Sequence, residues 1–422
     1  MKILMLSSSD SGGGAARAAY RLHQAFINNS IESRMRVGIK NTDTHTICGP
    51  PGKIGKAMAL FKAEVAEQIM KLQHSSNRNL HSPAFIPSGL VGEINKSDID
   101  IVQLNWICSE FLSVEDIGRI KKPIVWRLSD MWPFCGAEHI AVDDPTVRWR
   151  FGYTKKNRPL DHKGLDIDRW VWNRKKRSWK RAIQIVAPSN WMAGCVRSSA
   201  LMKDWPVSVI PSTIDLNQFR PWDKRFSREV LGLPAKRKLI LFGAVGGLKD
   251  QNKGGDLLEN AVINGVSRDL FADVEGILFG QSSPVKPPEF GIPLHWMGRV
   301  SDDATLSLIY SAADLMVVPS RQENLPQTAI EAQACGCPVV GFDAGGVPDA
   351  VSDRETGYLA RAFDTDDLAF GISWVLADEV RHARLSSAAR ERALQLWSPE
   401  VVVKKYLEVY KQAIQATMTG SK

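Results

Sequence analysis

The stretch "PSRQENLPQTAIEAQACGCPVVGFDAGG", residues 319–346, places two glutamates, Glu323 and Glu331, on either side of Pro326. Apolar runs typical of buried strands precede and end it, "DLMVVPS" and "PVVGFD". Pro326 favours the first turn of a helix between them. The pattern predicts Glu323 in the loop at the carboxyl end of the first strand. It predicts Glu331 about one and a half turns into the helix.

The rest of the chain repeats this alternation of strand and helix. Further runs that lack strict polar–apolar alternation are "KILMLSS", "DIDIVQLNW", "KPIVWRLSD", "IQIVAPS", "RKLILFGA" and "VEGILFG". Strands buried on both faces have this composition, and longer helical patterns separate many of them. The sequence therefore predicts an α/β protein with doubly wound parallel sheets.

The length of 422 residues favours two domains, because single cores stop growing well below that size. A segment rich in Pro, Ser and Asp at residues 207–222 is the predicted linker. It separates an N-terminal Rossmann-like domain, residues 1–206, from a C-terminal one, residues 223–396. Two such domains leave a cleft that faces the carboxyl ends of both sheets.

Composition narrows the class of protein. The 44% hydrophobic and 24% charged content is typical of soluble globular proteins, and no apolar run is long enough to span a bilayer. We expect "MKILMLSS" to be a first strand and not a signal peptide. The six cysteines form no C-x-x-C pair, which favours a reduced cytoplasm and no metal site. A net charge of +8 suits anionic partners or a solvated surface; no nucleic-acid signature accompanies it.

Two glycine-rich loops follow predicted strands and enter helices. In "SSSDSGGGAARAAY" the loop ends at Gly13 and Gly14, and in "FGAVGGLKDQNKGG" it carries Lys249 and Lys253. Such loops let a backbone approach a ligand, and the helix start offers N–H groups to an anion. Arg17 interrupts the G-x-G-x-x-G pattern, which disfavours an NAD-dependent dehydrogenase. A plain tight turn and solvated lysines are the alternative.

The two glutamates can bind hydroxyl groups beside a diphosphate. The N–H groups at the helix start can take the diphosphate, while Glu331 accepts hydrogen bonds from a ribose diol. Glu323 can accept from the hydroxyls of a sugar beyond the phosphates. The alternative is a surface glutamate and a partner of the helix dipole.

The motifs occur in a specific order over nearly the whole chain. They include "GGGAARAAYRLH", "IVAPSNWM", "VIPSTIDLNQF", "MGRVSDDATLSLIYSAADLMVVPS", "ENLPQTAIEAQACGCPVVGFDAGGVPD" and a closing "WSPE" helix. This arrangement resembles the retaining GT-B glycosyltransferases of family 4, with their E-x7-E motif. The resemblance implies a GT-B fold closed by a C-terminal helix, residues 397–422, that returns to the first domain. It also implies sugar transfer from a nucleoside-diphosphate-sugar, with no metal and no further cofactor.

The resemblance assigns a role to each matching position. Glu323 corresponds to the family residue that contacts the transferred sugar, and Glu331 to the one that binds the ribose. The remaining implied donor contacts are Lys253, which matches the family lysine, the amides near Asn324 and Leu325, the backbone near Arg299 and Val300, and the loop glycines Gly13 and Gly14.

Two positions depart from the family pattern. Gly243-Ala244 stands where an arginine is common, so the diphosphate charge would rest on Lys253, helped by Lys249. Ser129-Asp130 stands where His-Asp is common. We expect Asp130 to point into the cleft as a catalytic residue and His139 to replace the missing imidazole; a structural His139 is the alternative.

A long segment after Asp130 is the predicted acceptor site. It holds His139, Trp149 and Arg150 among other aromatic and basic residues, which suit a sugar ring beside a phosphate. These residues predict a glycan or lipid-diphosphate-linked acceptor, as in cell-surface polysaccharide biosynthesis. The enzyme would then work in the cytoplasm, docked on the anionic inner face of the membrane. A structural insertion packed around Trp149 is the alternative.

The basic, Trp-rich stretch at residues 168–192 has two interpretations. It is either a membrane-surface helix or, as we favour, a domain helix with Trp172 and Trp179 in the core. Two alternatives to a transferase also stay open. One is a non-catalytic sugar-nucleotide-binding protein, and the other is an epimerase or phosphorylase on the same fold.

Overall fold

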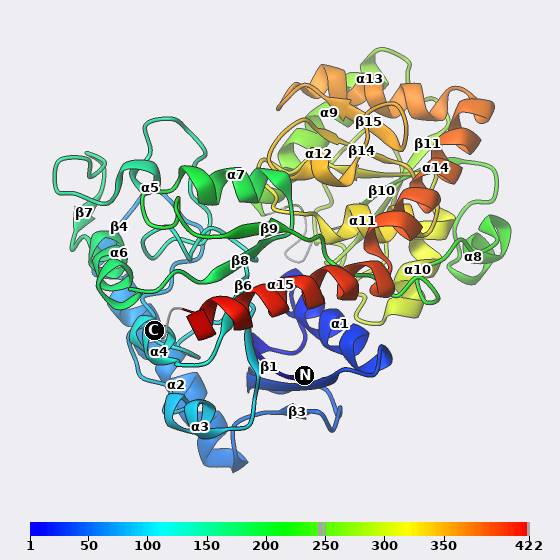
Figure 1. The fold of residues 1–422 in the computed structure, drawn as a ribbon. Coiled ribbons are helices and arrows are strands. Elements are labelled where there is room, and N and C mark those ends of the chain that lie inside the picture. The colour runs from blue at the N-terminus through cyan, green and yellow to red at the C-terminus, as the bar shows by residue number, and fades with distance from the viewer. Residues whose placement is uncertain (244–247, 249, 420–422) are drawn as a thin grey trace. The chain divides into compact units, whose positions relative to one another are not determined.

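A computed structural model describes residues 1–243, 248 and 250–419 of the chain. Ala244 and Lys249, two of the positions singled out above, lie outside the described residues. The chain forms two compact units (Figure 1). Unit 1 comprises Met1–Ile210 and Val403–Lys422, and unit 2 comprises Pro211–Val402. Each unit is built around its own parallel sheet, as the sequence predicted.

Unit 1 has a seven-stranded sheet in the order β3-β2-β1-β5-β6-β8-β9, in which every pairing is parallel. Its strands are β1 (Lys2–Ser9), β2 (Glu32–Ile39), β3 (Ile47–Cys48), β5 (Ile101–Leu104), β6 (Ile124–Arg127), β8 (Gln184–Ala187) and β9 (Val207–Val209). Its helices are α1 (Gly14–Asn28), α2 (Gly52–Met70), α3 (Val91–Lys96), α4 (Val114–Arg119), α5 (Arg148–Phe151), α6 (Ile167–Ser178) and α7 (Asn190–Ser198). A small antiparallel ribbon joins β4 (Gln73–His74) to β7 (Lys163–Gly164).

Unit 2 has a six-stranded parallel sheet in the order β12-β11-β10-β13-β14-β15. Its strands are β10 (Lys238–Gly243), β11 (Val274–Phe279), β12 (Leu294–Trp296), β13 (Leu315–Val318), β14 (Val339–Phe342) and β15 (Gly357–Ala360). Its helices are α8 (Lys224–Val230), α9 (Gly255–Ser267), α10 (Asp303–Ala312), α11 (Gln327–Ala334), α12 (Val347–Ala350), α13 (Thr365–Leu376) and α14 (Glu379–Trp397), and a 3-10 turn spans Gln251–Lys253.

The ends of the predicted domains differ from those of the units. The first residues of the predicted linker, Val207–Val209, pair with β8 as an edge strand, so the sheet of unit 1 extends further than expected. Trp397, predicted to open the closing helix, lies instead in the core of unit 2, where its carbonyl accepts from the N–H of Ile214 at 2.9 Å. The local composition favoured a linker at residue 207, because composition carries no information about pairing with another strand.

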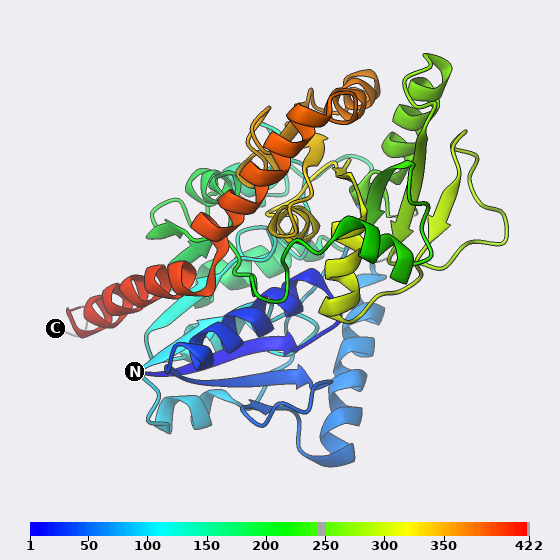
Figure 2. The same ribbon diagram turned by 90° about the vertical axis from the view of Figure 1, so that its right-hand side faces the viewer.

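The last helix, α15 (Pro399–Thr419), packs by its later turns on unit 1 beside α1 (Figure 2). The rings of Tyr406 and Tyr410 lie 5.9 and 5.8 Å from that of Phe26. The Tyr410 hydroxyl donates to Oε1 of Gln103, on β5, at 2.9 Å. Aromatic packing and a satisfied buried hydroxyl therefore fix these turns of α15 on unit 1.

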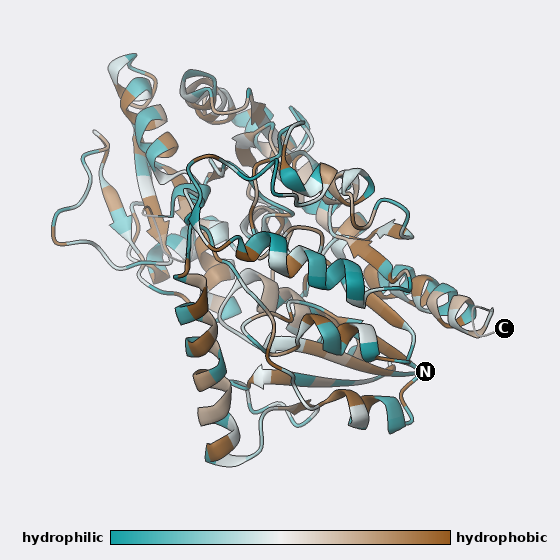
Figure 3. Ribbon diagram, turned by 90° about the vertical axis from the view of Figure 1, so that its left-hand side faces the viewer, coloured by the Kyte–Doolittle hydropathy of each residue, from teal (hydrophilic) through white to brown (hydrophobic). Residues whose placement is uncertain are grey.

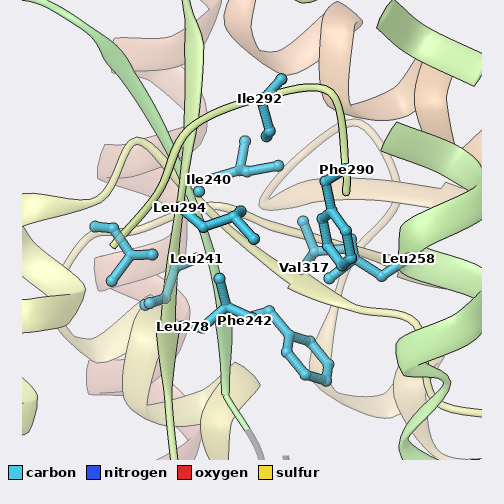
Figure 4. Close-up of a pocket in the computed structure, with 11 residues that line it drawn as sticks. Ile240, Leu241, Phe242, Leu258, Leu278, Phe290, Ile292, Leu294 and Val317 are labelled. Carbon is cyan, nitrogen blue, oxygen red and sulfur yellow. The ribbon is translucent and has the colours of Figure 1, made fainter. Parts of the chain in front are cut away.

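A small cavity of about 10 Å³ lies between the sheet of unit 2 and the segment that leads into β12 (Figure 4). Its walls are apolar and include Ile240, Leu258, Phe290 and Leu294. This volume is about that of one water probe, and its lining offers no polar partner.

The basic, Trp-rich stretch forms α6 and is a domain helix. Trp172 and Trp179 are buried, and the indole of Trp179 donates to the carbonyl of Val114 at 2.8 Å. Arg174 is buried as well and pairs with Glu115. The interpretation as a membrane-surface helix is thus wrong for the face that carries these tryptophans. Among the described residues, no helix combines the length and apolar character needed to cross a bilayer.

Candidate functional site

Three loops meet at the carboxyl edge of the unit 2 sheet. They follow β10, β13 and β14, which are neighbours in the strand order. The backbone N–H of Arg321 donates to the carbonyl of Asn252 at 2.8 Å, which joins the first two loops. The N–H of Gly346 donates to the carbonyl of Glu323 at 2.7 Å, which joins the second and third. Residues distant in sequence are therefore held together by main-chain bonds.

Two glycines make this close approach possible. Gly254 has a φ of +69°, and a Cβ there would lie 1.9 Å from the carbonyl oxygen of Pro319. A Cβ on Gly346 would lie 1.5 Å from the carbonyl oxygen of Asn324. Neither site has room for a side chain, so any other residue would push the loops apart.

Lys253 and Glu323 form an ion pair across the first two loops. The Nζ of Lys253 lies 2.5 Å from Oε1 of Glu323, which also accepts from the Ser320 hydroxyl at 3.1 Å. Burial acts to lower the pKa of Lys253, but the charge and hydrogen bond of Glu323 outweigh it, and the pKa is raised. The lysine therefore stays charged at neutral pH. With 33% of its side chain exposed, it can also meet an anion from outside.

Glu331 is a buried carboxylate below this pair. It lies on α11 with 3% of its surface exposed, and its Oε2 accepts from the Tyr310 hydroxyl at 2.7 Å. Tyr310 lies on α10 and is fully buried. A buried carboxylate needs hydrogen-bond partners to offset its lost hydration, and Tyr310 supplies one. Sequence reasoning missed Tyr310, because its contact depends on the packing of α10 against α11.

The start of α11 lacks a side-chain cap. Its N-cap is Pro326, which makes no side-chain cap hydrogen bond. Leu325 is buried in the core of unit 2, so its side chain anchors the turn that precedes the helix. The predicted role of the amides near Asn324 and Leu325 with a diphosphate stays a prediction.

The predicted base-contacting residues lie on another loop of the same unit. Arg299 and Val300 come after the edge strand β12, where Arg299 is exposed and Val300 packs against the core. Their predicted role is also untested by any contact in the described residues.

Arg321 is a second residue that sequence reasoning missed. Its guanidinium donates to both carboxylate oxygens of Asp256, at 2.8 and 2.6 Å, and to the carbonyl of Gln251 at 2.6 Å. These bonds lower the pKa of Asp256. Arg321 therefore clamps the loop after β13 to the start of α9. Its position two residues before Glu323 was the available signal, but its partner is far away in the sequence.

In unit 1, the ends of β1, β5 and β6 form an edge, and the predicted residues Asp130 and His139 lie together there. The carbonyl of Trp106, just after β5, accepts from the N–H of Ser8 at the end of β1 at 2.7 Å. Its indole N–H donates to Oδ2 of Asp130, after β6, at 2.7 Å. Trp106, which the sequence did not single out, thus links the strand that leads to Gly13 and Gly14 with Asp130.

Asp130 is held from several sides. Its Oδ2 lies 2.6 Å from Nδ1 of His139, and its Oδ1 accepts from the backbone N–H of Trp132 at 3.0 Å. The other ring nitrogen of His139 lies 2.8 Å from the hydroxyl of Ser82. Asp130 keeps 18% of its side chain exposed, while His139 is buried. His139 therefore orients Asp130 and does not itself reach the surface, which corrects its prediction as a direct sugar contact.

The predicted acceptor residues Trp149 and Arg150 lie on the short helix α5. Trp149 is 1% exposed, packs 5.4 Å from the ring of Phe134 and donates to the carbonyl of Val142 at 3.1 Å. Arg150 stacks on Trp149 at 4.3 Å and pairs with Asp143 at 2.6 Å. The prediction that Trp149 stacks on a sugar is therefore wrong, since both ring faces are inside the domain. Arg150 stays part-exposed.

The loop glycines of unit 1 remain accessible. Gly13 is the N-cap of α1 and Gly14 its first residue. A Cβ on Gly13 would meet nothing within 4 Å, so the backbone there has open space beside it. Within the described part of the chain, no three His, Cys, Asp or Glu side chains gather as a metal site would require.

Part of unit 2 matches a known protein family. Residues 289–392, which include Glu323 and Glu331, match the family described as Glycosyl transferases group 1. A D-inositol 3-phosphate glycosyltransferase of Nocardiopsis dassonvillei is 30% identical over 267 residues, 55% of this chain and 56% of that protein. The chain thus spans about half the length of the curated relatives that it matches.

Solved structures share the fold over nearly the whole chain. The sucrose-phosphate synthase of Thermosynechococcus elongatus has a TM-score of 0.67 at 18% identity, covering 99% of this chain and 100% of that one. Anabaena Alr3699/HepE, in complex with UDP and glucose, has a TM-score of 0.64 at 17% identity, covering 98% and 100%. The two parallel sheets thus have the GT-B fold. The E-x7-E stretch lies inside residues 289–392, the part of the chain that matches the Glycosyl transferases group 1 family.

Proposed function

We propose that this protein transfers a sugar from a nucleoside-diphosphate-sugar to an acceptor, with retention of anomeric configuration. The observation that carries the proposal is the ion pair of Lys253 and Glu323, which joins two loops at the carboxyl edge of the unit 2 sheet. Ligands of open α/β sheets bind at this edge. The pair places a cation, Lys253, which can bind phosphate, beside a carboxylate, Glu323, which can accept hydrogen bonds from sugar hydroxyls.

The cation acts on the leaving group. As the bond between the sugar and the diphosphate breaks, negative charge grows on the diphosphate, and Lys253 offsets it. Such preorganised charges supply a large share of the rate in many enzymes. The acceptor hydroxyl attacks from the face that the diphosphate leaves, and its proton passes to the diphosphate oxygen. The new glycosidic bond forms as the old one breaks, which retains the configuration.

The carboxylates position the donor. Glu323 accepts from hydroxyls of the transferred sugar, and Glu331 accepts from the ribose, with its second interaction to Tyr310 fixing its orientation. On unit 1, we propose Gly13 and Gly14 as contacts to phosphate and Asp130 as a contact to sugar. Alr3699/HepE in complex with UDP and glucose supports a UDP-sugar as the first donor to test.

The acceptor is proposed on broader grounds. The relative named a D-inositol 3-phosphate glycosyltransferase supports an acceptor that carries phosphate. We propose a glycan or a lipid-diphosphate-linked glycan, as in cell-surface polysaccharide biosynthesis, reached from the cytoplasmic face of the membrane. The net charge of +8 suits such anionic acceptors.

A two-step experiment tests the proposal. Thermal shift with UDP-, GDP- and ADP-sugars identifies the donor, because a ligand of the native state raises apparent stability. Product analysis by NMR, with and without acceptor, then shows the anomeric configuration. Binding without turnover would favour a sugar-nucleotide-binding protein. Conversion of the donor sugar without an acceptor would favour an epimerase.

A further inference from the structure

The helix α2 of unit 1 exposes apolar side chains in its first half. Ile54 is 83% exposed, and Met58, Leu60 and Phe61 are each at least half exposed. Ile54, Met58 and Phe61 follow one another at i, i+4 and i+7, which places them on one face of the helix. Figure 3 shows apolar residues along this helix, which stands at the lower left of that view.

The second half of the same helix is anchored. Ala66 is buried, and Ile69 and Met70 pack against the core of unit 1. The Nζ of Lys62 donates to the carbonyl of Pro87 at 2.8 Å, which fixes the middle of the helix. The exposed apolar face is therefore presented by a helix whose other end is held in place.

The charges around this face have one sign. Lys53, Lys56 and Lys62 lie among the apolar residues, and no Asp or Glu occurs between residues 44 and 63. Within α2 the first carboxylate is Glu64, just after the apolar face. Apolar side chains bordered by lysines suit a surface that is negative outside and apolar beneath, which describes an anionic lipid bilayer.

We infer that the first half of α2 docks unit 1 onto an anionic membrane. Ile54, Met58 and Phe61 enter the boundary between headgroups and acyl chains, while Lys53 and Lys56 contact lipid phosphates. The site rests on the proposed function in that a lipid-linked acceptor would be presented there. It names a surface different from α6, where sequence reasoning had looked for membrane contact.

Vesicle co-sedimentation of the full chain tests the inference. Wild type should bind phosphatidylglycerol vesicles, bind phosphatidylcholine vesicles less, and lose binding in high salt. The double variant Lys53→Gln with Lys56→Gln should weaken partitioning about fivefold for each lysine. Ile54→Ser and Phe61→Ser should each weaken it about tenfold, since both remove apolar area from the bilayer.

A matched control separates the helix from general exposure. Val380 on unit 2 is also 83% exposed, and Val380→Ser should leave vesicle binding unchanged. If wild type fails to bind anionic vesicles, or if the α2 variants bind as wild type does, the inference is overturned. A wild-type dimer that becomes monomeric in Phe61→Ser, without lipid binding, would overturn it in favour of self-association.

Binding of UDP to the same variants keeps the two proposals apart. Unchanged UDP affinity with lost vesicle binding supports the docking face. Vesicle binding by a protein that shows no nucleotide binding would leave the docking face supported and contradict the proposed function.

Discussion

The two units present polar groups at the carboxyl edges of their sheets in different ways. Unit 2 keeps a part-exposed ion pair, Lys253 with Glu323, on loops joined by main-chain bonds. Unit 1 holds Asp130 with the indole of Trp106 and the buried ring of His139. In unit 2 the exposed part of Lys253 can therefore interact directly with an anionic ligand. In unit 1 the neighbouring side chains fix the orientation of Asp130, and 18% of its side chain stays exposed.

Removal of the cation should have the largest effect. We expect Lys253→Ala to lower turnover about 10²–10³-fold, since one preorganised charge on a leaving group contributes about that much. Arg299→Ala, an exposed arginine on another loop of the same unit, should change it little. Steady-state rates with a saturating donor measure both. Equal, small losses would mean that another cation offsets the diphosphate charge.

Acid should weaken unit 1 through a buried histidine. His23 lies between the hydroxyls of Ser33 and Thr46, each 2.8 Å away, and burial lowers its pKa to about 4. Between its ordinary pKa of about 6.5 and pH 4, the unfolded chain binds a proton that the folded one does not. Stability should therefore fall by roughly 3 kcal/mol as pH drops through that window.

Urea titrations of wild type and His23→Gln between pH 7 and 4 measure this loss. The variant should lack most of the pH dependence, while His45→Gln, at an exposed histidine of the same unit, should keep it. A similar slope in all three proteins would show that other groups control the acid response.

Loss of Glu331, the proposed ribose contact, should have the next largest effect. Glu331→Ala should weaken the binding of UDP by roughly 1.5–3 kcal/mol, the typical value of a hydrogen bond to a charged group. Calorimetry measures the affinity, and a thermal melt verifies that the variant folds with Tyr310 left without this partner. Glu355→Ala serves as the control at an exposed glutamate of unit 2. Unchanged affinity in the Glu331 variant would remove its ribose role.

The smallest effect should come from the link in unit 1. Trp106→Phe removes the donor to Asp130 but keeps an aromatic ring, and we expect turnover to fall about tenfold with nucleotide affinity unchanged. Trp191→Phe is the matched control for loss of an indole donor, since that indole donates to a different carboxylate, Asp143, at 2.9 Å. Equal activity in both variants would show that His139 alone is enough to orient Asp130.

The sequence alone determined the fold class, and it placed the candidate residues of unit 2 on the loops and helix where the structure has them. Unbroken apolar runs such as β13 identify strands buried on both faces, and Glu323, Glu331 and Lys253 follow from loop and helix positions read locally. Neighbouring parallel strands end at one edge, so local reading was enough to expect residues after them to gather there. The family resemblance rested on the same stretches.

Only the tertiary structure decided which side chains are buried and which face solvent. Trp149 and Arg150 have a composition that suits sugar binding, yet Trp149 packs inside the domain. Ile54 and Phe61 are of residue types that are usually buried, yet they are exposed. Tyr310 and Trp106 gained their roles from contacts across the fold. Burial and long-range hydrogen bonds depend on which distant elements pack together, and residue type and spacing do not encode that partner locally.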